Sequence, residues 1–180
     1  MRIAGLMDND VVDGTGVSVS YWAQGCPLHC KGCHNEHTWD FNGGEEIDKG
    51  KLIKKILKKL RASDVQRNFS VLGGEPLAPK NIENTLDILQ AVRKSFPNIQ
   101  INLWTGYTLN ELRARQDEKV NMIFEDIDYL ITGRFVLKKR DITLKWRGSK
   151  NQKIYKCKTL SKWGHEVELT DVSEEMDNAR

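Results

Sequence analysis

The chain has 180 residues, of which 39% are hydrophobic, and a formal net charge of +3. This length suffices for one substantial core, and no apolar run approaches the roughly 18 residues of a membrane-spanning helix, so we expect one domain over residues 1–180 and no membrane insertion. The net charge is too small to indicate a nucleic-acid partner. The N-terminus does not resemble a secretory signal, and with only four cysteines we expect a reduced, cytoplasmic protein.

The first third of the chain predicts two strands, a cysteine-containing loop and a helix. Residues 2–7 and 17–22 have the β-branched, apolar and aromatic content of strands, and the second strand ends at the cysteine loop. Asp48 is a suitable N-cap for the helix that follows. Its apolar residues recur at helical spacing, with lysines on the opposite face: Leu52, Ile53, Ile56, Leu57 and Leu60.

Strands and helices continue to alternate along the chain. The expected elements are a strand at 69–72, a turn at 73–76, a helix at 82–96, a strand at 100–104, a short helix at 109–115 and a strand at 129–132. This alternation predicts an α/β fold with a mainly parallel sheet, which right-handed crossovers would curl into an open or partial barrel. The turns after the strands would meet at the carboxyl edge of the sheet, where such proteins bind ligands. Residues 171–180 are polar, and we expect a frayed tail.

Three cysteines, Cys26, Cys30 and Cys33, lie within eight residues, with three and then two residues between them. Ferredoxin-type runs instead space their first three cysteines by two residues and close the cluster with a fourth. A four-iron cluster held by only three thiolates keeps one iron free for a substrate. The spacing therefore favours chemistry at the cluster over simple electron transfer.

Other interpretations of the same residues are possible. A structural zinc ion would take the three thiolates and a fourth ligand from His29, His34 or His37. Residues 30–34 also match the haem-attachment pattern, but that pattern usually accompanies export. A disulfide framework is the poorest match, because so few cysteines in a chain of this length indicate a reduced protein.

Two motifs in this order resemble the radical S-adenosylmethionine (SAM) enzymes. They are the cysteine triad and, forty residues after Cys33, Gly73-Gly74-Glu75-Pro76 at a strand end. Within that superfamily the chain is most similar to the activating proteins of the anaerobic, class III ribonucleoside-triphosphate reductases. The resemblance extends over nearly the whole chain and is carried by residues 13–17, 25–27, 33–35, 104–108, 128–135 and 147–152.

The resemblance implies a fold, cofactors and partners. The fold would be a partial (β/α) barrel of the radical SAM type, with a [4Fe-4S] cluster on Cys26, Cys30 and Cys33 and SAM on the fourth iron. One electron, from a low-potential donor such as flavodoxin, would split SAM into methionine and a 5'-deoxyadenosyl radical. That radical would remove a Cα hydrogen from one glycine of the anaerobic ribonucleoside-triphosphate reductase, the protein substrate.

The resemblance also assigns seven residues to the SAM site: Gly73, Gly74, Glu75, Thr105, Gly106, Tyr107 and Asp128. The two glycines of the first turn would let the backbone approach the methionine end, and the glutamate would pair with the amino group or fix the turn. The second turn would reach the ribose or carboxylate, or would be a structural turn only. The aspartate would contact SAM or cap the start of a strand.

Two positions depart from the superfamily pattern, and two features have no assigned role. Gly32 stands where an aromatic residue often precedes the third cysteine, so adenine packing must come from elsewhere. Thr132 stands where relatives often carry an acid, so this position could offer SAM only a neutral hydroxyl in place of a carboxylate. Cys157 would close the reactive iron as a ligand, so we interpret it as an incidental thiol. Residues 134–162 hold eleven Lys or Arg and one acid, Asp141, which indicates a solvated face or a docking surface for an acidic partner rather than nucleic acid.

The function we expect is therefore that of a glycyl-radical activating enzyme. Two alternatives stay open: another small radical SAM enzyme that modifies a nucleoside precursor or a peptide, and a zinc-bound interaction module without catalysis. Metal analysis separates the last from the others, because the enzymes need oxygen-sensitive iron and sulfide.

Overall fold

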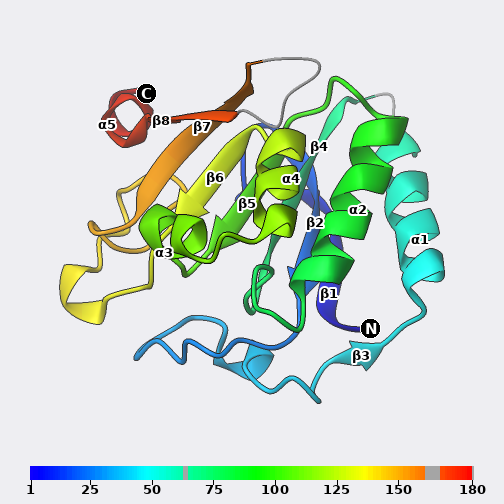
Figure 1. The fold of residues 1–180 in the computed structure, drawn as a ribbon, viewed down its shortest axis with the longest axis horizontal. Coiled ribbons are helices and arrows are strands. Elements are labelled where there is room, and N and C mark those ends of the chain that lie inside the picture. Colours follow the sequence, from blue (N-terminus) through cyan, green and yellow to red (C-terminus); the bar gives the residue numbers. More distant parts are fainter. Residues whose placement is uncertain (63–64, 161–166, 180) are drawn as a thin grey trace.

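The computed structural model describes residues 1–62, 65–160 and 167–179, so part of the basic segment, residues 161–166, lies outside the described residues. The described strands form one eight-stranded sheet with the order β3-β1-β2-β4-β5-β6-β7-β8 (Figure 1). The strands are β1 (Arg2–Asp10), β2 (Val17–Ala23), β3 (Glu45–Glu46), β4 (Arg67–Gly73), β5 (Ile101–Thr105), β6 (Tyr129–Thr132), β7 (Lys153–Thr159) and β8 (Val167–Asp171). The helices are α1 (Lys49–Arg61), α2 (Ile82–Ser95), α3 (Leu109–Ala114), α4 (Glu118–Asp126) and α5 (Ser173–Asn178), with short 3-10 turns η1 (Glu36–Thr38) and η2 (Leu137–Lys139).

The centre of the sheet is parallel. Strands β2, β4, β5 and β6 pair in a register that places apolar residues side by side, as in Val19 opposite Phe69 and Leu103 opposite Leu130. The outer strands β1, β3, β7 and β8 pair antiparallel. The sheet is therefore mixed, whereas the alternation of elements alone predicts a mainly parallel one. The curvature of a partial barrel stays a prediction.

Helices α1, α2 and α4 cover one face of the sheet (Figure 1). The helix predicted after Asp48 is confirmed: the Asp48 side chain accepts a hydrogen bond from the N–H of Lys51 at 2.9 Å. Helix α4 was not expected from the sequence, yet it begins at an N-cap, Asp117, and buries Val120, Ile123 and Phe124. These apolar side chains, with those from alternate positions of the central strands, form the main core.

The opposite face of the sheet holds the ligand-binding candidates. Because side chains alternate along a strand, Trp22 of β2, Leu72 of β4 and Trp104 of β5 point away from the covering helices. The loop between β1 and β2 approaches the same face, where the carbonyl of Asp13 accepts a hydrogen bond from Ser70 Oγ at 2.6 Å. The result is a hollow between the cysteine loop and Asp13.

The C-terminal segment is folded, and the prediction of a frayed tail over 171–180 is wrong for most of it. Residues 173–178 form α5, and Ser173 Oγ accepts a hydrogen bond from the N–H of Ile154 in β7 at 2.9 Å. The buried guanidinium of Arg147 pairs with Asp177 and also donates to the carbonyl of Gln152 at 3.2 Å.

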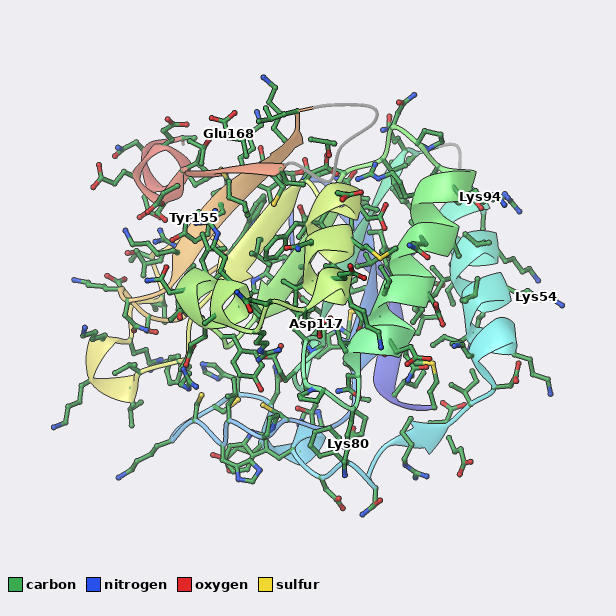
Figure 2. All side chains as sticks on the ribbon, viewed as in Figure 1. Lys54, Lys80, Lys94, Asp117, Tyr155 and Glu168 are labelled. Carbon is green, nitrogen blue, oxygen red and sulfur yellow. The ribbon has the colours of Figure 1, made fainter. Side chains whose placement is uncertain are left out.

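Figure 2 shows the side chains of all elements in the same view. Among the described residues, no helix combines the length and apolarity needed to cross a bilayer.

Candidate functional site

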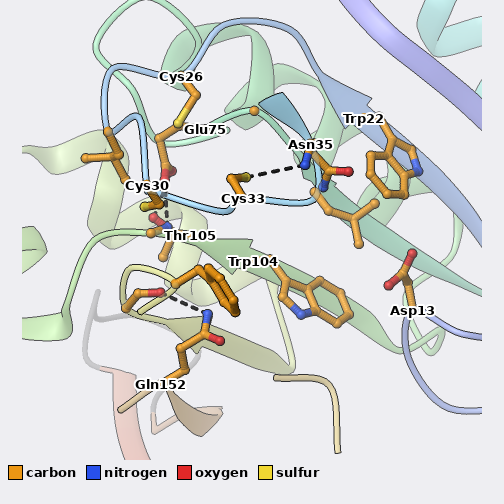
Figure 3. Close-up of a pocket in the computed structure, with 17 residues that line it drawn as sticks. Asp13, Trp22, Cys26, Cys30, Cys33, Asn35, Glu75, Trp104, Thr105 and Gln152 are labelled. Atoms are coloured by element: carbon orange, nitrogen blue, oxygen red, sulfur yellow. Dashed lines mark hydrogen bonds between the residues drawn. The ribbon is translucent and has the colours of Figure 1, made fainter. Parts of the chain in front are cut away.

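The three cysteines lie on the loop that leaves β2, and all three line one cavity at the carboxyl edge of the sheet (Figure 3). All are free thiols; Cys26 is buried, whereas Cys30 and Cys33 are half-buried. The N–H groups of Gly25 and Cys26 donate to the carbonyls of residues 38 and 39 at 2.7 and 3.0 Å, which fixes the start of the loop. The sequence triad is therefore assembled around a cavity of about 200 Å³.

Glycine at position 32 has a structural reason. Gly32 has a φ of +76°, a left-handed conformation that disfavours a larger side chain, and a Cβ there would lie 3.2 Å from Leu137 Cδ1. The turn also brings the N–H of Cys33 to the carbonyl of Cys30 at 3.0 Å. The left-handed backbone at position 32 and the nearby Leu137 side chain thus disfavour an aromatic residue before the third cysteine.

Burial determines the protonation of two of the thiols. It raises the pKa of Cys26 to about 11 and also raises the pKa of Cys30 above its ordinary value. Both thiols are therefore neutral in the metal-free protein at pH 7. Iron binding must displace their protons, as it does at other thiolate sites.

The fourth cysteine lies elsewhere. Cys157 is buried in β7 among the side chains of the main core, and its N–H donates to the carbonyl of Asp128 at 2.8 Å. Three thiols and no fourth at the cavity match the donor set of a four-iron cluster with one open iron. Within the described residues, no group of three His, Cys, Asp or Glu side chains lies close enough together to hold one metal ion.

The glycine pair at the end of β4 contacts the end of β2 and the start of the cysteine loop. Gly73 has a φ of +106°, and a Cβ on it would lie 2.5 Å from the backbone nitrogen of Ala23. A Cβ on Gly74 would lie 2.6 Å from the carbonyl oxygen of Gly25. Both glycines line the cavity, but the close approach that requires them is to the protein's own backbone.

Glu75 fixes the turn, which is one of its two expected roles. Its carboxylate is fully buried; one oxygen accepts hydrogen bonds from Thr105 Oγ1 at 2.7 Å and Leu77 N at 2.9 Å, and the other accepts from Gly106 N at 2.7 Å. Burial raises its pKa to about 7. Glu75 thereby ties the end of β4 to the end of β5, the two strand ends that border the cysteines.

The structure brings Thr105 and Gly106 to the cavity, but not Tyr107 or Asp128. The Arg115 guanidinium lies over the ring of Tyr107, with its Cζ atom 3.8 Å from the centroid of that ring. Asp128 precedes β6 and so lies at the amino edge of the sheet, where it accepts hydrogen bonds from Arg93 Nη2 at 2.8 Å and from the N–H of Ile101 at 2.7 Å. Its position matches the strand-capping alternative.

Nine further residues line the cavity without an assigned role from the sequence: Asp13, Trp22, Leu28, Asn35, Leu72, Trp104, Gly133, Phe135 and Gln152. The two tryptophans lie on the same face of β2 and β5, the strands on either side of β4, because side chains alternate along each strand. Burial and the neighbouring Asp10 raise the pKa of Asp13 to about 7. Gln152 Nε2 donates to the carbonyl of Gly133 at 2.9 Å, which holds the loop over 147–152 against the end of β6.

Comparison with known proteins agrees with this site. Residues 12–155 match the family described as "4Fe-4S single cluster domain", so the chain is an iron-sulfur protein. It is 36% identical to the anaerobic ribonucleoside-triphosphate reductase-activating protein of Vibrio cholerae over 148 residues, which cover 82% of this chain and 92% of that protein. The corresponding Escherichia coli protein is 36% identical over 147 residues (81% and 92%), and that of Enterobacteria phage T4 is 31% identical over 159 residues (87% and 94%). The chain belongs to the family of anaerobic ribonucleoside-triphosphate reductase-activating proteins.

Proposed function

We propose that the protein is a radical SAM enzyme that activates an anaerobic ribonucleoside-triphosphate reductase by creating a glycyl radical on it. When bound, a [4Fe-4S] cluster would supply one electron to SAM, and the resulting 5'-deoxyadenosyl radical would take a Cα hydrogen from a glycine of the reductase. The observation that carries the proposal is the convergence of three thiols, without the fourth cysteine, on the carboxyl edge of a parallel strand group in a chain of this family.

The chain's own residues would hold and orient the reactants. Cys26, Cys30 and Cys33 would ligate three irons. The Glu75 hydrogen bonds to Thr105 and Gly106 keep two strand ends at fixed separation beside them, so the cavity is shaped before a ligand enters. The parallel centre of the sheet, with its cavity on the face opposite α1, α2 and α4, supports the partial barrel as the form of this fold.

Aromatic residues supply the apolar part of the cavity. Trp22 and Trp104 border the space beyond the cysteines (Figure 3), and Phe135 also lines the cavity. Their rings would exclude water from the reacting centre and would offer the adenine contact that Gly32 does not provide.

The chain's free cysteines suit a reducing compartment, so we also propose a cytoplasmic location.

Anaerobic reconstitution with iron and sulfide tests the proposal. We expect an oxygen-sensitive protein that forms 5'-deoxyadenosine from SAM when reduced with dithionite, and a glycyl radical, detected by electron paramagnetic resonance, when the reductase is added. A zinc-loaded, colourless protein that does not cleave SAM would contradict it. SAM cleavage without a radical on the reductase would assign the enzyme another substrate.

A further inference from the structure

The outer edge of β1 is open over most of its length. The strand runs from Arg2 to Asp10, whereas β3, its neighbour on the outer side, pairs only with Arg2 and Ile3. In the part of the chain that the structure describes, no other strand pairs with this edge (Figure 1). The outward-pointing backbone groups of residues 4–9 are therefore without a strand partner.

The open edge has no charged residue or proline in its first half. Proteins commonly use these residues to keep an exposed edge from pairing with another chain. Residues 3–7 read Ile-Ala-Gly-Leu-Met, and the side chain of Met7 is 50% exposed. Between a register shift on either side, Gly5, Leu6 and Met7 pair with β2 in continuous register. This stretch therefore keeps the regular geometry that a further strand needs.

A groove of about 430 Å³ follows the same residues, and we call it the β1 groove. It is lined by residues 4–7, Trp22, Asn35 and His37. Because side chains alternate between the two faces of a strand, a groove that touches four consecutive residues lies along the backbone rather than over one face alone. A Cβ on Gly5 would have no atom within 4 Å, so there is room for a second chain beside it.

The β1 groove adjoins the cysteine cavity. Trp22 and Asn35, both labelled in Figure 3, line the two spaces. The indole Nε1 of Trp22 is buried and has no hydrogen-bond acceptor within the described structure. Buried donors are nearly always paired in native proteins, and a carbonyl from a bound backbone would supply this acceptor. A chain that leaves the cavity over this shared wall meets the open edge of β1.

We propose that the open edge of β1 binds an extended segment of the reductase next to the target glycine; this inference rests on the proposed function. A glycine inside a polypeptide has chain on both sides. The cavity, at about 200 Å³, is small even for SAM and the glycine, so the flanking residues have to lie outside it. One flank would add a strand beside β1 and place an apolar side chain in the β1 groove.

Strand pairing would also serve the reaction. Backbone hydrogen bonds along residues 4–9 would fix the register of the bound segment. The glycine Cα would then enter the cavity at one position relative to SAM, as hydrogen abstraction requires. Backbone pairing supplies affinity, whereas the β1 groove selects the side chain that accompanies the glycine.

Hydrogen exchange tests the strand pairing without a variant. The full-length holoprotein is exchanged anaerobically with and without the full-length reductase, and the amides are followed by mass spectrometry. We expect the amides of residues 4–9 to exchange about tenfold or more slowly with the reductase bound. The matched control is β8, the strand at the other edge of the sheet, whose exchange should not change.

Two results of this experiment would overturn the inference. One is unchanged exchange at β1 when the reductase is bound. The other is protection of β1 that rises with protein concentration in the absence of the reductase, because the edge would then bind a second copy of this chain.

Gly5→Leu tests the β1 groove. The added side chain has space and would occupy the groove, so we expect a folded protein. The matched control is Gly50→Leu, an exposed position in α1 where a Cβ would meet only a side-chain oxygen of Asp48, at 3.3 Å. In isothermal titration, Gly5→Leu should bind the reductase about tenfold more weakly, the loss expected for one or two hydrogen bonds. The control should bind as wild type does.

Activity separates docking from chemistry. With dithionite and no reductase, Gly5→Leu should form 5'-deoxyadenosine from SAM at the wild-type rate; with the reductase, its glycyl radical should form more slowly. Wild-type affinity for the reductase in this variant would overturn the inference. An equal loss of SAM cleavage without the reductase would also overturn it, because Gly5 would then belong to the SAM site. If the variant does not fold, the exchange of wild type decides. Absence of SAM cleavage by wild type would instead contradict the proposed function.

Discussion

Gly73→Ala tests whether the glycine pair serves the protein's own backbone. The added Cβ would lie 2.5 Å from Ala23 N and 2.6 Å from Ala23 O, both main-chain atoms that cannot rotate away. The φ of +106° adds strain of roughly 1–3 kcal/mol for an alanine. Overpacking adds about 1–3 kcal/mol. We therefore expect the free energy of unfolding to fall by roughly 2–6 kcal/mol, a large part of the total stability of an ordinary domain.

The assay is urea unfolding of the cluster-free, SAM-free protein, followed by far-ultraviolet circular dichroism. The matched control is Gly5→Ala, because no atom lies within 4 Å of a Cβ at that position. The control should change stability by no more than about 0.5 kcal/mol in the destabilising direction. If Gly73→Ala unfolds like wild type and loses only SAM binding, the reasoning is refuted and the glycine serves the ligand instead.

Three further predictions follow from the site. Alanine at any one of the three cavity cysteines should abolish SAM cleavage, whereas Cys157→Ala should largely retain it; loss of activity in a folded Cys157→Ala protein would overturn the ligand assignment. Asp128→Ala should lower the free energy of unfolding by about 1–3 kcal/mol, because it leaves the N–H of Ile101 without its acceptor and removes the ion pair with Arg93, but the folded variant should still cleave SAM, and a selective loss of SAM affinity would contradict the capping role. The raised pKa of Glu75, about 7 against the ordinary 4.5, means that the folded protein binds its proton more tightly than the unfolded chain. Stability from this group is present below about pH 4.5 and is lost as the pH rises to about 7, so Glu75→Gln should flatten the pH dependence of urea unfolding in that window; an unchanged profile would count against the burial argument.

Local patterns predicted the parts of the site that neighbouring residues determine. The cysteine spacing, the strand before it and the Gly-Gly-Glu-Pro turn all follow from short segments, and the structure brings them to one edge of the sheet. Asp128, one of the expected SAM contacts, lies away from the cysteine cavity, because it precedes β6 and the parallel sheet places it at the amino edge. Attention to that order would have favoured the capping alternative.

Contacts between distant segments escaped prediction. The place of Asp13 in the cavity depends on its loop folding over the sheet and contacting Ser70. Strands β7 and β8 are antiparallel additions after β6, and the lysines of β7 resemble a solvated surface. Helix α4 escaped because only three of its apolar residues, Val120, Ile123 and Phe124, are buried along nine positions.

The contacts of Arg147 connect the C-terminal helix α5 to the wall of the cysteine cavity. The guanidinium pairs with Asp177 of α5 and donates a hydrogen bond to the carbonyl of Gln152. The side chain of Gln152 donates in turn to the carbonyl of Gly133, which lines the cavity. Deletion of the last ten residues would therefore remove the ion-pair partner of Arg147 and weaken the packing of the cavity wall, although the deleted residues do not line the cavity. A tag or fusion protein should therefore be attached after α5, so that the contacts of this helix with Arg147 are kept.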